Sequence, residues 1–362
     1  MFAIFLANSA HYSGRSDRAL RGLTAQRFLC RCGRLAAVTV VLVGTTAAGK
    51  SSLAVALALR YTAAGRRSEV VNADSMLLYR GMDIGTAKPS LAERRGVPHH
   101  LIDVLDVTQT STVADFQRLA RDAISDCLLR NVVPIVVGGS ALYVRAIVDD
   151  FEFPGTDPAL RAELESELSR VGSQSLHHRL ASVDPVAAAT IEPANGRRIV
   201  RALEVGMLTG RPYAATLPAH SYRLPGVVQI GLAIDRAELD RRVAARVRAM
   251  WQAGLVDEVR RLDRAGLRHG RTASRALGYR QVLDFLANSI SEAEAADQTV
   301  VATRRFARRQ DIWFRKDSRI HWLPWDHPQL VDSAYALAGP DGNGALERAE
   351  PSQRGHESAM ED

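Results

Sequence analysis

The stretch Gly44-Thr45-Thr46-Ala47-Ala48-Gly49-Lys50-Ser51 fits the pattern G-x-x-x-x-G-K-[ST] of a phosphate-binding loop, or P-loop. Its two glycines allow the backbone to curl, so that successive N–H groups point at phosphate oxygens. The β-branched residues 37–43 before it indicate a buried strand, and residues 50–64 after it have helical periodicity. We therefore expect all eight residues to bind a diphosphate or triphosphate, with the Lys50 ammonium on the terminal phosphate and the Ser51 hydroxyl on Mg²⁺.

Strands and helices alternate along the rest of the chain. The sequence predicts further strands at residues 68–73, 100–104, 132–137 and 227–234. It predicts amphipathic or basic helices at residues 112–130, 236–265 and 291–316. This order predicts an α/β fold, a P-loop NTPase-like parallel sheet flanked by helices.

The middle of the chain has a different pattern. Pro154, Gly155 and Pro158 mark a break, and residues 158–218 show helical patterns without a clear strand. We expect a helical insertion domain at residues 151–224, within a P-loop core formed by residues 35–150 and 225–335. Residues 336–362 are predicted to be a disordered tail. Residues 1–34 are expected to be a disordered or non-native extension, although their Arg-rich, acid-poor composition also fits a transit peptide.

The charge balance favours anionic partners. The 362 residues carry a formal net charge of +7 with a pI near 9.6, as expected for binding to phosphate-rich ligands, nucleic acid or an anionic membrane. No apolar run approaches the ~20 residues of a membrane-spanning helix, so we expect no membrane partner. The cysteines, Cys30, Cys32 and Cys127, form no disulfide or zinc pattern, which favours a reducing, cytoplasmic compartment.

Two large classes of P-loop protein lack support in the rest of the sequence. A GTPase should contain an N/T-K-x-D motif, and a motor ATPase should contain an apolar strand that ends in an acid; residues 132–137 lead instead into Gly138-Gly139-Ser140. Small-molecule kinases and P-loop transferases remain. Asp74 follows the second predicted strand, at the edge where α/β folds place their chemistry. Taken alone, Asp74 is equally well explained as a turn residue.

Together these motifs resemble the tRNA dimethylallyltransferase (tRNA isopentenyltransferase) family, bacterial type. The likeness covers roughly residues 38–325, and its most specific part is Gly81-Met82-Asp83-Ile84-Gly85-Thr86-Ala87-Lys88-Pro89. The other stretches that carry it are Ala73-Asp74-Ser75-Met76 with Tyr79, Val137-Gly138-Gly139-Ser140 with Leu142-Tyr143, Arg201-Ala202-Leu203-Glu204-Val205, Gly278-Tyr279-Arg280-Gln281 and the basic residues 303–316.

The resemblance implies transfer of a dimethylallyl group from dimethylallyl diphosphate to N6 of the adenosine 3′-adjacent to the anticodon, in tRNAs that read codons beginning with U. Diphosphate leaves, and Mg²⁺ is required. It implies that Asp74 is the catalytic base and that Ser140 replaces a family threonine at the diphosphate. Arg242 would be a diphosphate ligand, with Arg246 as the second choice. Leu77 stands where the family commonly has a glutamine, which removes a polar contact to the reacting base.

The residues suggest how such a transfer would proceed. The N6 amine is a weak nucleophile, and an allylic diphosphate compensates because its C–O bond breaks early. The P-loop, Ser140 and an arginine would stabilise the departing diphosphate, and Asp74 would take the amine proton. The residues expected to contact tRNA, apart from the insertion domain as a whole, are Asp74, Ser75, Met76, Leu77, Leu78, Tyr79, Ser140, Arg161, Arg197, Arg198, Arg201, Arg275, Gly278, Tyr279 and Arg280.

Other functions share parts of this pattern. An adenylate isopentenyltransferase, which acts on free AMP, ADP or ATP, has the same P-loop and aspartate, but the basic C-terminal helices and the helical insertion favour a larger RNA substrate. A small-molecule kinase needs an arginine-bearing lid and a nucleoside pocket, and the sequence identifies neither. A non-catalytic RNA-binding module leaves Lys50 and Asp74 unexplained. We expect a monomer with no stable protein partner.

Overall fold

The computed structural model describes residues 38–150, 153–213 and 220–339. The expectations for residues 1–34 and for residues 340–362 of the tail concern parts of the chain outside these described residues. Within them, no helix is long and apolar enough to cross a membrane.

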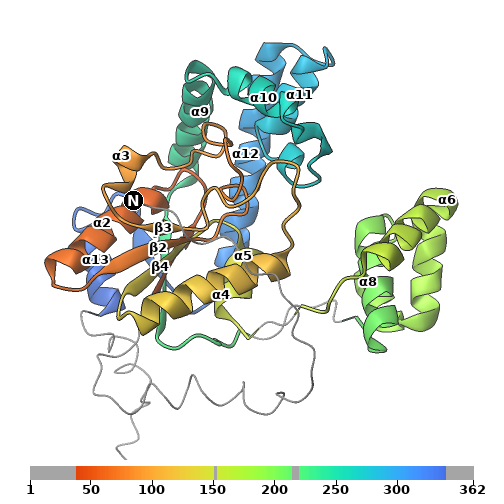
Figure 1. Cartoon of the computed structure of the whole chain (residues 1–362), viewed down its shortest axis with the longest axis horizontal. Helices are drawn as coiled ribbons and strands as arrows, with labels where there is room; N and C mark the ends of the chain where they lie inside the picture. The colour runs from red at the N-terminus through yellow and green to blue at the C-terminus, as the bar shows by residue number, and fades with distance from the viewer. Residues whose placement is uncertain (1–37, 151–152, 214–219, 340–362) are drawn as a thin grey trace, which may run out of the picture. The chain divides into compact units, whose positions relative to one another are not determined.

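A six-stranded, entirely parallel sheet forms the centre of the fold (Figure 1). Its strands are β1 Thr39–Gly44, β2 Ser68–Asn72, β3 His99–His100, β4 Val133–Val137, β5 Val227–Ala233 and β6 Ile320–Pro324. They lie side by side in the order β3-β2-β4-β1-β5-β6. Strand β1 is therefore central, with β4 and β5 as its neighbours.

Most of the helices pack on the two faces of this sheet, whereas α6, α7 and α8 have an apolar core of their own. They are α2 Lys50–Ala63, α3 Leu91–Arg94, α4 Val113–Leu129, α5 Ala141–Val148, α6 Pro158–Val183, α7 Pro185–Thr190, α8 Gly196–Thr209, α9 Arg236–Gln252, α10 Leu255–Arg264, α11 Tyr279–Leu286, α12 Glu292–Phe314 and α13 Leu330–Ala338, with short 3₁₀ turns at Leu267–His269 and Ala273–Arg275. The predicted parallel α/β fold with flanking helices is confirmed.

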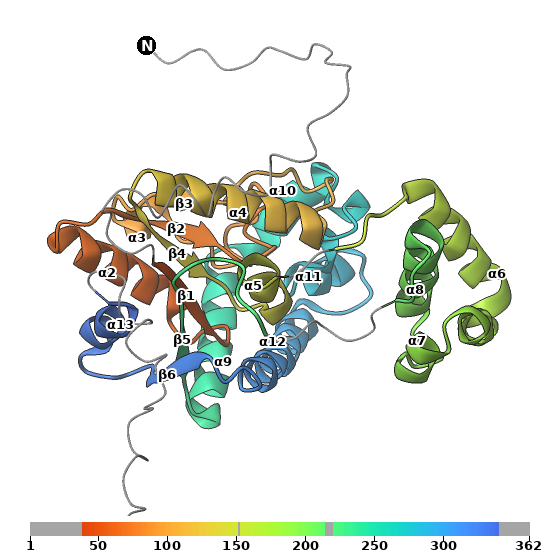
Figure 2. The same cartoon turned by 90° about the horizontal axis from the view of Figure 1, so that it is seen from below.

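Both faces of the sheet are buried, which explains the continuous apolar run of β1. Successive side chains of a strand point to opposite faces. Val41 and Val43 pack into a core with α4, α5, α10 and α11, whereas Val40 and Leu42 pack into a second core with α2 and α13. Helices α2 and α13 lie side by side in both views (Figures 1 and 2), and the rings of Tyr61 and Tyr335 meet edge-on with centroids 4.9 Å apart.

Helices α6, α7 and α8 pack on one another around a separate apolar cluster (Figure 2). The buried carboxylate of Glu204 on α8 holds the start of this segment, because it accepts hydrogen bonds from Thr156, Arg161 and Arg201. Arg201 also donates to the backbone oxygens of Pro154 and Gly155. The two arginines thus fasten the entry to α6 onto α8.

The structure corrects three predicted elements. Strand β3 stops at His100 instead of continuing to residue 104, because Leu101 (φ 60°) and Asp103 (φ 59°) adopt left-handed backbone conformations. The helix predicted over residues 236–265 is two helices, α9 and α10, separated at Gly254 with φ 93°. Residues 336–338, assigned to the disordered tail, form the last turn of α13, and Ala338 is buried. Strand β6 was not predicted at all.

Candidate functional site

The chemistry-bearing loops lie at the carboxyl ends of neighbouring strands. Strand β1 leads into the P-loop, β2 into Asp74, β4 into Gly138-Gly139-Ser140 and β5 into α9. These four strands are adjacent in the order β2-β4-β1-β5. Because parallel strands end at the same edge of a sheet, their four loops surround a single region, the usual ligand site of open α/β sheets.

The P-loop has the backbone conformation that the two glycines permit. Gly44 (φ 131°) and Gly49 (φ 97°) have positive φ values, and Ala47 is left-handed with φ 62°. A Cβ atom on Gly44 would lie 3.1 Å from the backbone oxygen of Leu232, so the start of the loop passes close to β5. Ser51 is exposed in the first turn of α2. Its hydroxyl is a hard oxygen ligand of the kind that Mg²⁺ accepts beside phosphates.

Three charged side chains are grouped at this loop. The Lys50 ammonium donates to the backbone oxygen of Thr45 at 2.6 Å, and Arg246 donates to the Thr46 hydroxyl at 3.4 Å. Burial, followed by repulsion from Arg246, lowers the pKa of Lys50 from 10.5 to about 8, while the nearby Asp74 opposes this shift. Burial also lowers the pKa of Arg246, which Asp74 again opposes. Two cations held close together without a matching number of anions favour a bound anion.

Arg242 lies one turn before Arg246 on α9 and has a different environment. Its guanidinium stacks 4.3 Å from the centre of the Trp325 ring, and its buried Nη1 has no hydrogen-bond partner among the described atoms. It is close enough to Arg246 to contribute to lowering that residue's pKa. Of the two arginines, Arg246 is therefore the one in contact with the P-loop, although Arg242 was ranked first from the sequence.

Asp74 is fixed at the end of β2 by a local turn. The Asn72 side chain accepts a hydrogen bond from the Asp74 N–H at 2.8 Å and donates to the Asp74 and Leu101 carbonyls. One Asp74 carboxylate oxygen accepts from the Met76 N–H at 2.9 Å. The half-buried carboxylate is thus oriented by its own turn and lies within electrostatic range of Lys50 and Arg246.

The remaining polar residue of this edge is Ser140. It occupies the N-cap position of α5, but its hydroxyl makes no capping hydrogen bond. A half-buried hydroxyl that is not used by its own helix is available to a ligand.

The residues predicted to contact tRNA fall into three groups. The side chains of Leu78, Tyr79 and Tyr279 are fully buried, and Gly278 is buried as well. The structure therefore contradicts the prediction that these four residues contact tRNA directly. Tyr279 donates its hydroxyl to Glu258 instead. Arg161 and Arg201 are bound to Glu204. The third group, which like Arg161 and Arg201 is at least partly accessible, consists of Asp74, Ser75, Met76, Leu77, Ser140, Arg197, Arg198, Arg275 and Arg280.

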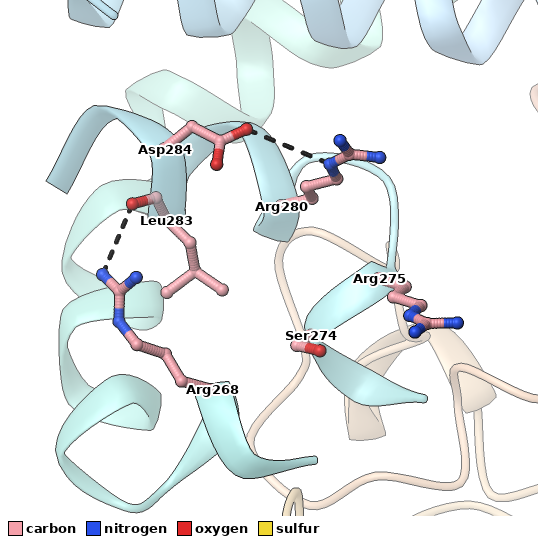
Figure 3. A pocket seen from close by; sticks show the side chains of 6 residues that line it. All are labelled: Arg268, Ser274, Arg275, Arg280, Leu283 and Asp284. Carbon is pink, nitrogen blue, oxygen red and sulfur yellow. Dashed lines mark hydrogen bonds and ion pairs between the residues drawn. The ribbon is translucent and has the colours of Figure 1, made fainter. Parts of the chain in front are cut away.

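Arg275 and Arg280 lie at one surface hollow of about 620 Å³ (Figure 3). Arg268, Ser274, Leu283 and Asp284 also line it. Within the described parts of the chain, Arg280 makes a 4.0 Å ion pair with Asp284, and both Arg275 and Arg280 are exposed. The hollow therefore presents guanidinium groups with little competing acid, which suits an anionic surface ligand.

Two residues that organise this site were missed from the sequence. Glu258 on α10 accepts hydrogen bonds from the backbone N–H groups of Asp83, Ile84 and Gly85. Gln310 on α12 accepts from the Thr46 N–H and donates to the Gly139 carbonyl. The sequence shows the apolar residues that surround Glu258 in α10. It contains no pattern that connects Glu258 or Gln310 to loops so distant in the chain.

One group of possible metal ligands occurs among the described residues, on β2, β3 and α4. Glu69, His100 and Cys127 have ligand atoms within 4.8 Å of one another. However, Arg130 donates to both Glu69 oxygens at 2.7 and 2.8 Å, and its hydrogen bonds are the largest cause that lowers the pKa of Glu69 to about 2. Burial raises the pKa of the Cys127 thiol to about 12. Glu69 is therefore paired with Arg130 and the Cys127 thiol stays protonated, so these residues need no metal ion.

Fold and site together define a parallel α/β protein in which a P-loop sequence lies near a carboxylate. A sequence profile of the IPP transferase family matches residues 77–317. A tRNA dimethylallyltransferase of Thermobifida fusca is 62% identical over 298 residues, covering 82% of this chain and 93% of the relative. One from Streptomyces coelicolor is 60% identical, covering 78% and 89%. The chain therefore belongs to the IPP transferase family, and the resemblance seen in the sequence is confirmed.

Solved structures agree with this assignment. A tRNA isopentenylpyrophosphate transferase from Bacillus halodurans is 37% identical with a TM-score of 0.62, covering 86% of this chain and 99% of that chain. A eukaryotic dimethylallyltransferase acting on tRNA has a TM-score of 0.71 at 24% identity, covering 88% and 82%, and shares the fold.

Proposed function

We propose that this protein transfers a dimethylallyl group from dimethylallyl diphosphate to N6 of the adenosine next to the anticodon of tRNA, on its 3′ side. The observation that carries the proposal is the position of Asp74 beside Lys50 and Arg246. A proton acceptor next to a cationic P-loop suits a reaction in which an anion leaves while an amine loses a proton. We further propose that its substrates are tRNAs that read codons beginning with U. We also propose that the enzyme is monomeric and cytoplasmic.

In the proposed reaction the allylic C–O bond breaks, the bond from N6 to the same carbon forms, and diphosphate departs with the electron pair. The P-loop N–H groups, Lys50 and Arg246 stabilise the charge that develops on the leaving oxygens. Ser140 lies at the neighbouring strand end and supplies a further hydroxyl donor. Asp74 orients the amine and accepts the N6 proton. Ser51 would hold Mg²⁺, which would supply positive charge to offset part of the charge of the diphosphate.

The acceptor base must leave its stack to reach Asp74. The accessible arginines of α8 and of the hollow at α11 are the groups that would hold the surrounding RNA, through phosphate contacts and stacking on unpaired bases. Single-stranded loops are the usual targets of such recognition, and an anticodon loop provides one.

Incubation with radiolabelled dimethylallyl diphosphate and Mg²⁺ tests the activity, with either unmodified tRNA or AMP as acceptor. We expect label in tRNA and none in AMP. Label in AMP but not in tRNA would instead establish an adenylate isopentenyltransferase.

The Asp74→Asn variant tests the role of the carboxylate. It retains an oxygen for the Met76 N–H but loses the proton acceptor, so we expect tRNA binding to persist and turnover to fall by about 10²–10⁴-fold. Asp122→Asn, which changes an exposed acid on α4, is the matched control. Normal turnover of Asp74→Asn would refute the base role.

A further inference from the structure

Gln310 joins two loops of the site that the chain separates widely. It lies on α12 and is only 6% exposed. Its Oε1 accepts a hydrogen bond from the Thr46 N–H at 2.8 Å, and its Nε2 donates to the Gly139 carbonyl at 2.7 Å. Thr46 belongs to the P-loop after β1, and Gly139 belongs to the turn after β4 that leads to Ser140. One amide therefore connects the ends of two adjacent strands.

The contact with Gln310 explains why residue 139 is a glycine. A Cβ atom on Gly139 would lie 2.3 Å from Gln310 Nε2, so the glutamine side chain would have to move out of its hydrogen bonds. The φ of Gly139 is not in the left-handed region, so its backbone does not require glycine. The nearest atom outside Gln310, the Gly44 backbone oxygen, would be at an ordinary 3.6 Å. The glycine is needed only because Gln310 occupies the space.

The surrounding packing holds Gln310 in this position. Ala307, one turn earlier on α12, packs with Leu239 and Val243 of α9, and Ala47 of the P-loop lies against this cluster. Helix α9 also carries Arg246. The P-loop is thus supported from one side by two helices, and Gln310 is the polar connection between that support and the backbone of the loop.

We propose that Gln310 is a positioning residue, which sets the P-loop at a fixed distance from the turn carrying Ser140. Because both polar ends of its side chain are already bonded to protein backbone, Gln310 acts through the loops and not by touching the ligand. Its absence would leave the Thr46 N–H and the Gly139 carbonyl without partners. This inference rests on the proposed use of the P-loop as the diphosphate site.

The Gln310→Met variant tests the proposal, since methionine has a similar length and makes neither hydrogen bond. Calorimetric titration with sodium diphosphate and MgCl₂ should show affinity reduced by roughly 10- to 100-fold, and kcat should fall by a similar factor, as expected for small displacements of a site. The KM for tRNA should stay within about twofold, because the RNA-contacting surface is unchanged. Gln298→Met, the same change at an exposed position of α12, should behave like the wild type.

Gly139 provides an independent test of the contact itself. Gly139→Ala alone should reproduce the loss seen in Gln310→Met, because its Cβ displaces the glutamine. In a Gln310→Ala background the same Gly139→Ala change should add little, since the clashing atom is gone. Unaltered diphosphate affinity in soluble, folded Gln310→Met, or fully additive losses in the double variant, would overturn the proposal.

The two proposals fail in different ways. If the wild type binds diphosphate but does not modify tRNA, the proposed function is wrong and the Gln310 comparison still stands. If the wild type does not bind diphosphate, both are wrong.

Discussion

Arg246 and Arg242 illustrate how strongly a side chain's role depends on one helical turn. Both lie on α9 and both are half-buried, but Arg246 donates to Thr46 while Arg242 stacks on Trp325. Their spacing of four residues predicts a shared helix face. It does not predict which of the two reaches the P-loop, because this depends on Trp325, a residue near the other end of the chain.

We expect Arg246→Ala to reduce prenyl transfer by about 10²–10³-fold, the usual cost of removing one donor from a developing anion. Affinity for tRNA should not change, because the lost guanidinium faces the P-loop. Steady-state kinetics combined with tRNA binding measurements check this. Arg248→Ala, an exposed arginine of the same helix, is the control. A larger loss in Arg242→Ala than in Arg246→Ala would reverse the order that the contacts indicate.

At the level of single residues, the sequence predicted those site residues whose positions depend only on neighbouring residues in the chain. Lys50, Ser51 and Asp74 each follow directly from a strand end, so their positions are determined within a few residues. Gln310 could not be predicted in this way, because its partner Thr46 is 264 positions away. The burial of Tyr279 could not be predicted either, because a tyrosine next to arginines is compatible with a surface that stacks on bases and also with a buried core position.

At the scale of elements, the helices α6, α7 and α8 depend on a charged group inside their own packing. Glu204 is completely buried and binds Arg161 and Arg201, and Arg161 is one of the residues first assigned to tRNA. Burial raises the pKa of Glu204, but hydrogen bonds from Arg161, Thr156 and Arg201 outweigh it and lower the pKa from 4.5 to about 2. The ionised carboxylate is therefore part of the folded structure.

Glu204→Gln should destabilise the protein by about 3 kcal/mol near neutral pH, since it leaves two arginines without their buried partner. The contribution of Glu204 is complete above its unfolded pKa near 4.5 and is lost as pH falls toward about 2, because the folded state then binds a proton it had excluded. Urea unfolding of both proteins between pH 7 and pH 3 measures this, with the exposed Glu163→Gln as control. A difference that stays constant with pH would contradict it.

Element boundaries were predictable where a local residue sets them. Helix α2 begins at Lys50 after the left-handed Gly49, as the P-loop pattern required. Strand β6 has no such marker: Ile-His-Trp-Leu-Pro follows a basic helix and has no clear alternation, and it becomes a strand only by pairing with β5. The left-handed conformation of Leu101 likewise has no local cause in residue type, whereas Asp103 is of a type that adopts this conformation more readily.

On the scale of the whole molecule, the excess positive charge of +7 is the property most relevant to a polyanionic substrate. Ion pairs within the fold leave this net charge unchanged, but they occupy individual cations: Arg130, Arg161 and Arg319, for example, are paired with acids. Composition alone therefore does not show which cations are available to RNA. The exposed Arg275 and Arg280 at the hollow are among the cations that remain available.

We expect the log of the tRNA affinity to fall linearly with the log of the salt concentration. Replacing Arg275 and Arg280 together by alanine should reduce the slope by about 1.4–1.8, since each lost phosphate contact removes roughly 0.7–0.9. Filter binding at several KCl concentrations checks this. The double variant Arg118→Ala with Arg260→Ala loses the same charge from other exposed positions and should keep the wild-type slope. Equal slopes in both double variants would show that the hollow does not contact phosphates.

The central place of β1 has a consequence for synthesis of the chain on the ribosome. Its neighbour β5 begins about 90 residues after β4 ends, which corresponds to roughly 5–20 s of translation. Throughout that interval the P-loop strand of the nascent chain has one unpaired edge, the kind of surface on which β-strands aggregate. Helices α6, α7 and α8 emerge in the meantime and have a core of their own to fold around. The strand that carries the phosphate-binding loop is therefore completed only by residues that leave the exit tunnel after this entire helical unit.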